Sequence, residues 1–359
     1  MLIAMMSERF TKSKAMVFPR QVLAGHGVLR SLPSVIDELG YSGRILIVTG
    51  ERTSSLAGKR VGSMLEKLGL DVRTEIAGAA NMESLNRINA VATSWAPRAV
   101  LGVGGGSKID LGKMAAKSCH AGFVSIPTSA SHDGIASPRV SIKDGVSPLS
   151  MEGIMPDAVI ADTQLISSAP YRMLASGCAD VISNQTALRD WELAVKWHGE
   201  IFSTTAASLS RYAAESVMSS ASRIRRNDET SAWLAVRPII ASGLAMGAAG
   251  TSRPASGSEH LFSHALDALS PGKALHGEQC GVGAIMMTAL HGGDWASIRS
   301  ALVRLRCPVT ADGLGVSETD IVRALVRART MRRNRYTILD RKKLTAESAR
   351  KLARKTMVI

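Results

Sequence analysis

The sequence predicts an α/β protein with two domains. Residues 1–166 are expected to form a Rossmann-like, parallel-sheet domain of the nucleotide-binding type, and residues 167–359 an all-helical domain. In the first half, short apolar runs alternate with stretches of helical spacing, which is typical of βαβ units. Beyond about Ser167, helical spacing dominates. Because ligands of such folds bind at the carboxyl ends of parallel strands, we expect the functional site in a cleft between the domains.

In the first half, glycine or proline marks the ends of several expected strands and helices. The apolar run Arg44–Thr49 ends at Gly50, the first helix ends at Gly69, and Pro127 ends a later strand. A polar loop is expected between Pro127 and the last strand. The expected order is strand 44–49, helix 56–68, strand 71–76, helix 82–95, strand 99–103, helix 108–118, strand 122–126 and strand 158–161.

The second half is predicted to be helical throughout. Small residues are plentiful and aromatic residues make up only 4 % of the chain, a composition that suits closely packed helices and self-association. We therefore expect a homo-oligomer. The expected helices cover residues 173–183, 187–198, 205–225, 232–249, 259–269, 282–290, 299–306, 318–333 and 345–355.

The basic charge is concentrated at the C-terminus. The chain has a formal net charge of +14, and residues 323–359 alone contain 13 basic and 2 acidic residues. Apolar residues interrupt this segment at helical spacing, so we expect packed helices with a solvated, arginine-rich face. No zinc-finger spacing or aromatic stacking pattern accompanies the charge, so we expect no nucleic-acid partner and no stable membrane anchoring. The apolar residues are Leu325, Val326, Met331, Leu344 and Leu352.

Composition and cysteine usage indicate an ordinary soluble enzyme. The chain has 359 residues, of which 45 % are hydrophobic and 21 % charged, and this excludes a disordered chain or a disulfide scaffold. Its four cysteines form no CxxC pair, which favours reduced thiols and a cytoplasmic location. No uncharged apolar run reaches about 18 residues, the length that predicts a membrane span. The N-terminal MLIAMMSERF lacks the basic lead of a secretory signal.

Two loops that follow expected strands carry ligand-binding chemistry. Gly104-Gly-Gly-Ser107 joins a strand to a helix, where glycines admit a phosphate to the backbone and the new helix offers free N–H groups. Asp110, in the first helical turn, can accept hydrogen bonds from loop amides or act as an ordinary cap. Residues 127–138 (PTSASHDGIASP) are dense in polar side chains directly after a buried strand, and there Asp133 can accept hydrogen bonds from substrate hydroxyls.

Three histidines within seventeen residues indicate a metal site. His260 and His264 lie one helical turn apart, and His276 opens the next helix. Two imidazoles on one helix and a third from a neighbouring helix can meet at one ion. Asp180, on an apolar helix, is a candidate for the carboxylate that completes the site. The alternative is a set of structural histidines; a metalloprotease is disfavoured because no HExxH occurs.

These segments resemble the archaeal sn-glycerol-1-phosphate dehydrogenase family. That family belongs to the wider group of iron-type alcohol dehydrogenases, glycerol dehydrogenases and dehydroquinate synthases. The resemblance runs nearly from end to end of the chain and begins at Pro19-Arg-Gln-Val-Leu-Ala-Gly25. The motifs that carry it are GGGSKID at 104–110, PTSASHDGIASP at 127–138, GCADVISNQTALRDWELA at 177–194, SGSEHLFSHALD at 256–267 and HGEQCGVG at 276–283.

The resemblance implies specific roles for residues of these motifs. Asp180, His260 and His276 match zinc ligands, and Asp133, Asp180 and His264 match substrate-contacting positions, so that Asp180 and His264 become the catalytic candidates. The positions that match the family's diphosphate-binding stretch are Gly106, Ser107, Lys108, Ile109 and Asp110. The positions that match contacts to the nicotinamide half are Thr128, Ser129, Ala130, Ser131 and Ser137.

The reaction implied by the resemblance is NAD(P)H-dependent reduction of dihydroxyacetone phosphate to sn-glycerol 1-phosphate, the backbone of archaeal membrane phospholipids. A Zn²⁺ ion would polarise the ketone for hydride transfer. A glycerol or polyol dehydrogenase and a lyase of the dehydroquinate synthase type are the alternatives on the same scaffold. Glu51 favours NAD, whereas Arg52 and Lys59 favour NADP, so these residues leave the choice of cofactor open. The resemblance implies use of both. The candidates for binding the substrate phosphate are Lys273, Arg253 and Arg139.

Overall fold

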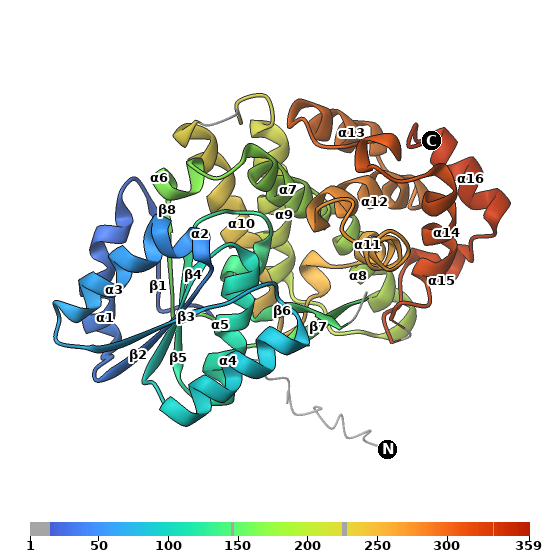
Figure 1. The fold of residues 1–359 in the computed structure, drawn as a ribbon. Coiled ribbons are helices and arrows are strands. Elements are labelled where there is room, and N and C mark those ends of the chain that lie inside the picture. The colour runs from blue at the N-terminus through green and yellow to red at the C-terminus, as the bar shows by residue number, and fades with distance from the viewer. Residues whose placement is uncertain (1–14, 145–146, 225–227, 333) are drawn as a thin grey trace, which may run out of the picture.

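The structure, a computed structural model, describes residues 15–144, 147–224, 228–332 and 334–359. A parallel sheet flanked by helices forms one part, and a cluster of helices forms the other (Figure 1). The predicted α/β fold class is confirmed. MLIAMMSERF, discussed above as a candidate signal, lies outside the described residues.

The sheet has six parallel strands in the order β1-β8-β5-β4-β2-β3. The predicted strands of the first half are confirmed to within a residue at each end. The edge strand β1 was not predicted, since its residues are only half-buried and lack a long apolar run. The strands are β1 (Gln21–Gly25), β2 (Arg44–Thr49), β3 (Asp71–Ile76), β4 (Ala99–Gly104), β5 (Gly122–Pro127) and β8 (Ala158–Asp162).

Helices cover both faces of the sheet because strand side chains alternate between them. Ile45 and Ile47 of β2 pack with α1 and α3 on one face, whereas Leu46 and Val48 pack with α4 and α5 on the other. The helix predicted over 56–68 begins earlier, as α2 and a π-helical segment (Ser54–Gly58) precede α3. The helices are α1 (Leu32–Leu39), α2 (Glu51–Thr53), α3 (Lys59–Glu66), α4 (Met82–Trp95), α5 (Gly106–Ser118) and α6 (Thr163–Ser167).

Part of the predicted polar loop is a β-hairpin. Its strands are β6 (Arg139–Asp144) and β7 (Ser147–Glu152), which pair antiparallel. Val140 and Ile142 alternate with polar residues and are buried against α4 and α5, so this hairpin has the period-2 pattern of a half-buried strand. It contacts α11 of the helical part and therefore bridges the two parts (Figure 1). The short helix η3 (Asp133–Ala136) precedes it.

The second part is helical, as predicted, and α10 lies on the side of it next to the sheet, in contact with α6, α7 and α9 (Figure 1). By length and composition α10 is apolar enough to cross a membrane, with a mean hydropathy of 1.4, but 78 % of that stretch is buried against neighbours such as α7 and α9. It is a core helix. The helices are α7 (Tyr171–Ile182), α8 (Asn184–His198), α9 (Thr204–Ser220), α10 (Glu229–Ala249), α11 (Ser258–Leu269), α12 (His276–Leu290), α13 (Trp295–Arg304), α14 (Glu318–Ala328), α15 (Ile338–Lys342) and α16 (Ala346–Lys355).

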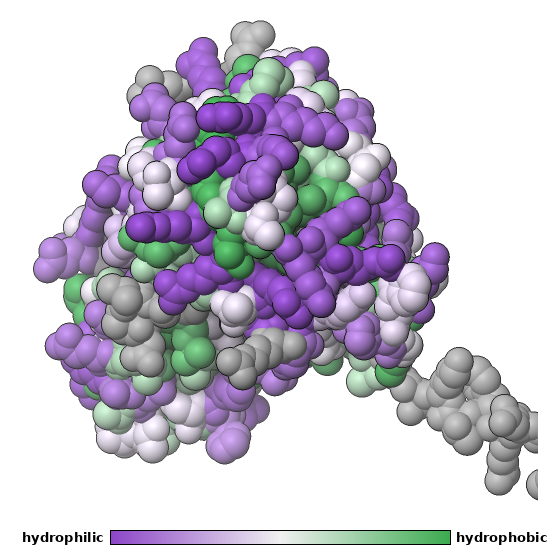
Figure 2. Space-filling model, turned by 90° about the vertical axis from the view of Figure 1, so that its right-hand side faces the viewer, coloured by the Kyte–Doolittle hydropathy of each residue, from purple (hydrophilic) through white to green (hydrophobic). Residues whose placement is uncertain are grey.

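The basic C-terminal segment packs in part and is solvated in part. Leu325 and Leu352 are buried, but Val326 is 41 % exposed, contrary to expectation, since its side of α14 faces outward. Figure 2 shows the side of the molecule on which α14–α16 lie, where hydrophilic side chains surround smaller hydrophobic areas. Arg332 and Arg335 depart from the expected solvated face because both are partly buried.

Candidate active site

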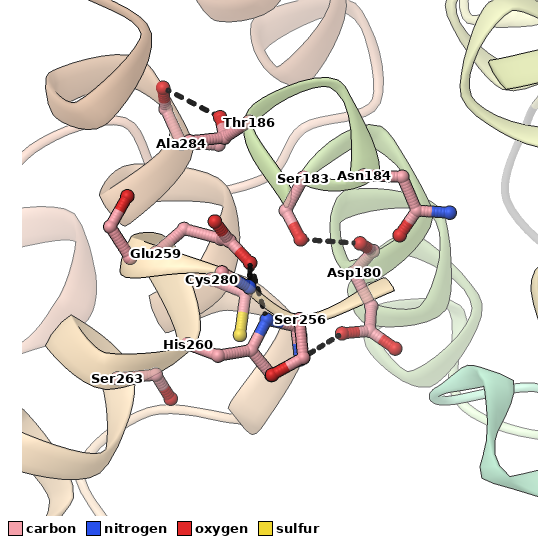
Figure 3. Close-up of polar contacts among 12 residues, drawn as sticks. Asp180, Ser183, Asn184, Thr186, Ser256, Glu259, His260, Ser263, Cys280 and Ala284 are labelled. Carbon is pink, nitrogen blue, oxygen red and sulfur yellow. Dashed lines mark hydrogen bonds and ion pairs between the residues drawn. The ribbon is translucent and has the colours of Figure 1, made fainter. Parts of the chain in front are cut away.

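Three helices bring the predicted metal ligands together. Asp180 lies in α7, His260 in α11, and His276 is the first residue of α12. From Asp180 Oδ1, the distances are 3.6 Å to His260 Nε2 and 3.8 Å to His276 Nε2. One ligand atom from each residue, together with Cys280, falls in a group whose members lie within 4.8 Å of one another. Figure 3 shows Asp180 pointing from α7 toward His260.

The donor chemistry of this group fits a divalent metal. Asp180 Oδ1 is buried and accepts no hydrogen bond, and such an oxygen is costly unless a cation or donor reaches it. Burial raises the pKa of the Asp180 carboxyl and lowers the pKa of both His260 and His276. Two neutral imidazoles and one carboxylate are the donor set that divalent transition metals prefer.

Neighbouring side chains turn both imidazoles toward Asp180. His260 lies between Glu259 and Asp180 (Figure 3), with its Nδ1 at 2.8 Å from Glu259 Oε1. The His276 Nδ1 lies 3.1 Å from Ser263 Oγ, which itself donates to Gln279 and so accepts from the imidazole. With its proton on Nδ1, each ring directs its Nε2 lone pair into the site, the arrangement that second-shell partners impose on metal-binding histidines.

Cys280 is a fourth candidate ligand that the sequence analysis missed. It lies one turn after His276 in α12, and its Sγ is 3.6 Å from His276 Nε2. Burial raises the pKa of its thiol well above the usual range, so the thiol stays protonated unless a cation stabilises the thiolate. The spacing of four residues between His276 and Cys280 was the available signal.

His264 lies beside the metal group rather than in it. Its helical spacing to His260 placed it among the possible ligands, but its ring centroid is 6.3 Å from that of His276, and it is absent from the 4.8 Å group. It is buried, and burial followed by the charge of Arg332 lowers its pKa to about 3. Its imidazole is therefore neutral and can accept or donate a proton.

The predicted substrate residues share one cavity with the metal group. This inner cavity, about 290 Å³ in volume, is lined by Asp133, Asp180, His260, His264 and His276 among others. The Asp133 amide donates to Asp180 Oδ2 at 3.2 Å, and Ser242 Oγ donates to Asp133 Oδ2 at 2.7 Å. One oxygen of Asp133 is thus already engaged.

A second hollow, the loop cleft, adjoins the inner cavity. Its volume is about 510 Å³, and it contains the start of α5 and the polar loop after β5. A Cβ at Gly106 would lie 1.8 Å from His132 Nε2, so only glycine lets His132 pack on the first turn of α5. The residues that line both hollows are Ser107, His132, Ser141, Lys143 and His276. The predicted cofactor residues that line the loop cleft are Gly106, Ser107, Lys108, Ser129 and Ser131.

The other predicted cofactor residues lie outside the loop cleft. Ile109, Thr128 and Ala130 are buried and line neither hollow, so their side chains are not available to a ligand there. Asp110 and Ser137 line the inner cavity instead. The structure therefore brings together only part of the predicted cofactor set.

Lys113 is a buried organising residue that the sequence analysis missed. It is fully buried in α5, and its ammonium lies 3.6 Å from Asp110 Oδ1. It donates to the carbonyl of Gly134 in η3 and, at 2.9 Å, to that of Arg139 at the start of β6. The single ammonium group of Lys113 therefore bonds α5 to η3 and β6, the two segments that border the inner cavity.

Comparison with known proteins agrees with this architecture. A glycerol-1-phosphate dehydrogenase (NAD(P)+) of Methanosarcina mazei is 49 % identical over 97 % of both chains, and one of Methanothermobacter thermautotrophicus is 49 % identical over 95 % of this chain and 98 % of the relative. The chain belongs to the glycerol-1-phosphate dehydrogenase family. Within that family's wider group, residues 23–170 match the iron-containing alcohol dehydrogenase profile.

Solved structures show the same fold as this member of the family. A probable glycerol dehydrogenase from Sinorhizobium meliloti superposes with a TM-score of 0.75 at 22 % identity, covering 96 % of this chain and 98 % of that one. Glycerol dehydrogenase from Schizosaccharomyces pombe gives a TM-score of 0.76 at 16 % identity, with coverages of 96 % and 91 %. These structures confirm the fold, and the family resemblance found in the motifs is confirmed by the 49 % identical relatives.

Gly177→Ala is expected to destabilise the protein by about 1–3 kcal/mol and to lower activity. A Cβ there would lie 2.0 Å from the Ala130 carbonyl oxygen, so α7 and its Asp180 must move away from the polar loop. Gly62→Ala in α3 is the matched control, since its Cβ would meet only Ile47 at 3.8 Å. Urea unfolding of both variants measures the effect, and equal stabilities would contradict the prediction.

Acid is expected to destabilise the metal-free protein partly through His264. Its pKa of about 3 in the fold lies below the value of 6.5 for an unfolded histidine, so between these values only the unfolded chain binds the proton. Stability conferred by this group is complete above pH 6.5 and falls by about 1.4 kcal/mol per pH unit as pH decreases toward 3. His264→Gln should reduce the slope of unfolding free energy against pH by that amount between pH 6 and 5; an unaltered slope would refute it.

Proposed function

We propose that the chain reduces dihydroxyacetone phosphate to sn-glycerol 1-phosphate with NADH or NADPH. The observation that carries this proposal is that the inner cavity, with the Asp180, His260 and His276 group, opens beside the loop cleft at a helix N-terminus. A metal next to a phosphate-binding loop suits hydride transfer from a dinucleotide to a carbonyl. The names of relatives 49 % identical over nearly the whole chain support the substrate and the cofactor.

The metal we propose is Zn²⁺, held by Asp180, His260 and His276. Bound there, it would serve as a Lewis acid toward the ketone oxygen of the substrate. Cys280 is close enough to join the donor set. The dinucleotide is proposed to lie in the loop cleft, with its diphosphate at the first turn of α5, where Gly106, Ser107 and Lys108 line the cleft, and its nicotinamide near the polar loop after β5.

The remaining roles belong to side chains of the inner cavity. Asp133, fixed by Ser242, would accept a hydrogen bond from the terminal hydroxyl of dihydroxyacetone phosphate and so orient the C2 carbonyl. As hydride from the nicotinamide reaches C2, the C2 oxygen must gain a proton. His264, neutral in its buried position, is placed to relay that proton. The Asp180 carboxylate serves both the metal and the amide of Asp133.

We propose a cytoplasmic enzyme, in keeping with its four free cysteines. Its product would supply the glycerophosphate backbone of archaeal membrane phospholipids. We further propose a homo-oligomer, and a division at residue 166 between a cofactor-binding and a helical metal-binding domain. One core cluster draws on both sides of that boundary, with Val159 and Ala161 packed among helices of the second part, so the two domains share their interior.

Oxidation of NADH and NADPH with dihydroxyacetone phosphate tests the proposal. The metal-replete protein should consume one reduced cofactor for each product, and enantiomer analysis should identify sn-glycerol 1-phosphate. Unphosphorylated dihydroxyacetone is the matched comparison and should be a much poorer substrate. No cofactor oxidation with dihydroxyacetone phosphate would refute the proposal, and a preference for the unphosphorylated substrate would favour a polyol dehydrogenase.

A further inference from the structure

Two arginine side chains line the inner cavity, and neither forms an ion pair with a residue that the structure describes. Arg332, which follows α14, lines the cavity, and its side chain makes no hydrogen bond or ion pair with any residue that the structure describes. Arg139, at the start of β6, lines the same cavity, and its Nε is buried without a partner. Its only side-chain hydrogen bond among those residues is a long one, 3.4 Å from Nη2 to Ser150 Oγ. Guanidinium groups placed in this way are normally paired.

The two arginines next to them are satisfied by the fold. Arg253 forms a two-pronged ion pair with Glu200 and donates to the Tyr336 carbonyl at 2.8 Å. Arg335 donates to the Ser256 carbonyl and, at 2.8 Å, to Ser252 Oγ. Hydrogen bonds within the fold therefore account for the burial of Arg253 and Arg335. They do not account for the burial of Arg332 and Arg139.

The surroundings of Arg332 are positively charged. Its own burial and the nearby Arg139 lower the pKa of its guanidinium, and its charge contributes to the low pKa of His264. Like charges gathered in a partly desolvated wall are unfavourable unless an anion binds between them. A phosphate dianion is the ligand that forked guanidinium donors fit best.

The position of these arginines indicates whether they would bind a phosphate of the substrate or a phosphate of the cofactor. Neither Arg332 nor Arg139 lines the loop cleft, whereas both line the inner cavity with Asp133, Asp180 and His264. Lys273, one of the candidates from the sequence, lines the loop cleft instead. Both arginines also line an adjoining hollow of about 780 Å³ together with Arg253 and Arg335, so they stand between that hollow and the inner cavity. An anion held on their inner side belongs to a ligand that also reaches the metal group.

We infer that Arg332 and Arg139 form the subsite that binds the phosphate of the substrate. The inference rests on the proposed function for its substrate and names the residues that select a phosphorylated ketone over a free one. Binding of the phosphate at this wall fixes the distance from the phosphate to the C2 carbonyl and so presents that carbonyl to the metal group. Arg332, whose side chain has no structural hydrogen bonds, carries the larger share.

The test compares Arg332→Gln with Arg327→Gln, an exposed arginine of α14 that lines none of these hollows. Arg332→Gln should lower kcat/KM for dihydroxyacetone phosphate about 100-fold, as expected when one partner of a desolvated charge pair is removed. Its activity on dihydroxyacetone, which has no phosphate to lose a contact, should fall much less. The loss should be equal with NADH and NADPH, and Arg332→Lys should recover part of it. Arg139→Gln should show the same pattern more weakly.

Other results would overturn the inference. Equal losses on both substrates would mean that Arg332 supports the fold or the metal group, and a loss confined to NADPH would assign it to the cofactor's 2′-phosphate. Calorimetry with inorganic phosphate separates this inference from the proposed function. If the wild type reduces no ketone yet binds phosphate, and Arg332→Gln does not, the subsite stands and the reaction fails. If the wild type reduces dihydroxyacetone phosphate and Arg332→Gln matches it, only the subsite fails.

Discussion

His260→Ala is expected to release the bound metal and to lower kcat/KM for dihydroxyacetone phosphate at least about 1000-fold. The imidazole supplies one of three proposed ligand atoms, and the remaining pair, Asp180 and His276, cannot replace it because both already point into the same site. Loss of the ring also leaves Glu259, its Nδ1 partner, without that contact. Elemental analysis of the purified variant, together with steady-state kinetics, measures both effects.

His26→Ala is the matched control for the metal prediction. That imidazole is 62 % exposed and pairs with Glu229 at the surface, so its removal should leave metal content and kcat/KM unchanged. Full metal occupancy in His260→Ala would contradict the assignment, and so would wild-type activity that persists after exhaustive chelation. Addition of Zn²⁺ should restore the chelated wild type but not the variant.

Lys113→Met is expected to destabilise the protein by about 3–5 kcal/mol, because removing one member of a buried ion pair leaves the other charge uncompensated. The change removes the ammonium that donates to the carbonyls of Gly134 and Arg139, and it leaves the carboxylate of Asp110 without its ion-pair partner. Urea unfolding at pH 7 measures the loss. A smaller second effect should be weaker binding of dihydroxyacetone phosphate, since Arg139 loses its backbone anchor.

Two further variants test the cause of that loss. Lys117→Met, one turn later in α5, removes an exposed lysine bonded to the Glu152 carbonyl and should cost much less. Combining Lys113→Met with Asp110→Asn should cost less than the two single changes together, because neutralising both partners leaves no buried charge. Additive losses would show that the buried pair is not the origin of the effect.

The sheet could be predicted from sequence because its central strands are continuous apolar runs. Ile45–Val48 and Val100–Val103 are buried on both faces, and such runs stand out without any alignment. The hairpin 139–152 was missed although Asp144-Gly145 is a dipeptide typical of hairpin turns, because only Val140 and Ile142 mark its buried face in place of a continuous apolar run. The tertiary packing on α4 and α5 decides it.

The candidate site was predictable to the extent that its residues are close in sequence. The histidines of α11 and α12 were found by spacing, whereas the role of Asp180 was suggested by its burial and by family resemblance. Spacing alone could not place His264 outside the ligand group, because ring orientation decides that difference. Lys113 bonds to distant segments, and Arg332 lines a cavity that distant segments form, so no local sequence pattern indicates either role. In the sequence, both residues are indistinguishable from an ordinary surface lysine and arginine.

The strand order has a consequence for how the chain folds during synthesis. β1 pairs with β8, so the first strand in the described part of the chain has its neighbour about 137 residues later, as the pairing of Gln21 with Ala158 shows. Until Asp162 has emerged, β1 cannot join the sheet, and the open edge of β5 stays unpaired. Closing so long a loop is slow and exposes strand edges to other chains. A nascent chain halted before residue 158 is therefore expected to bind holdase chaperones, whereas one extended through α10 buries that edge.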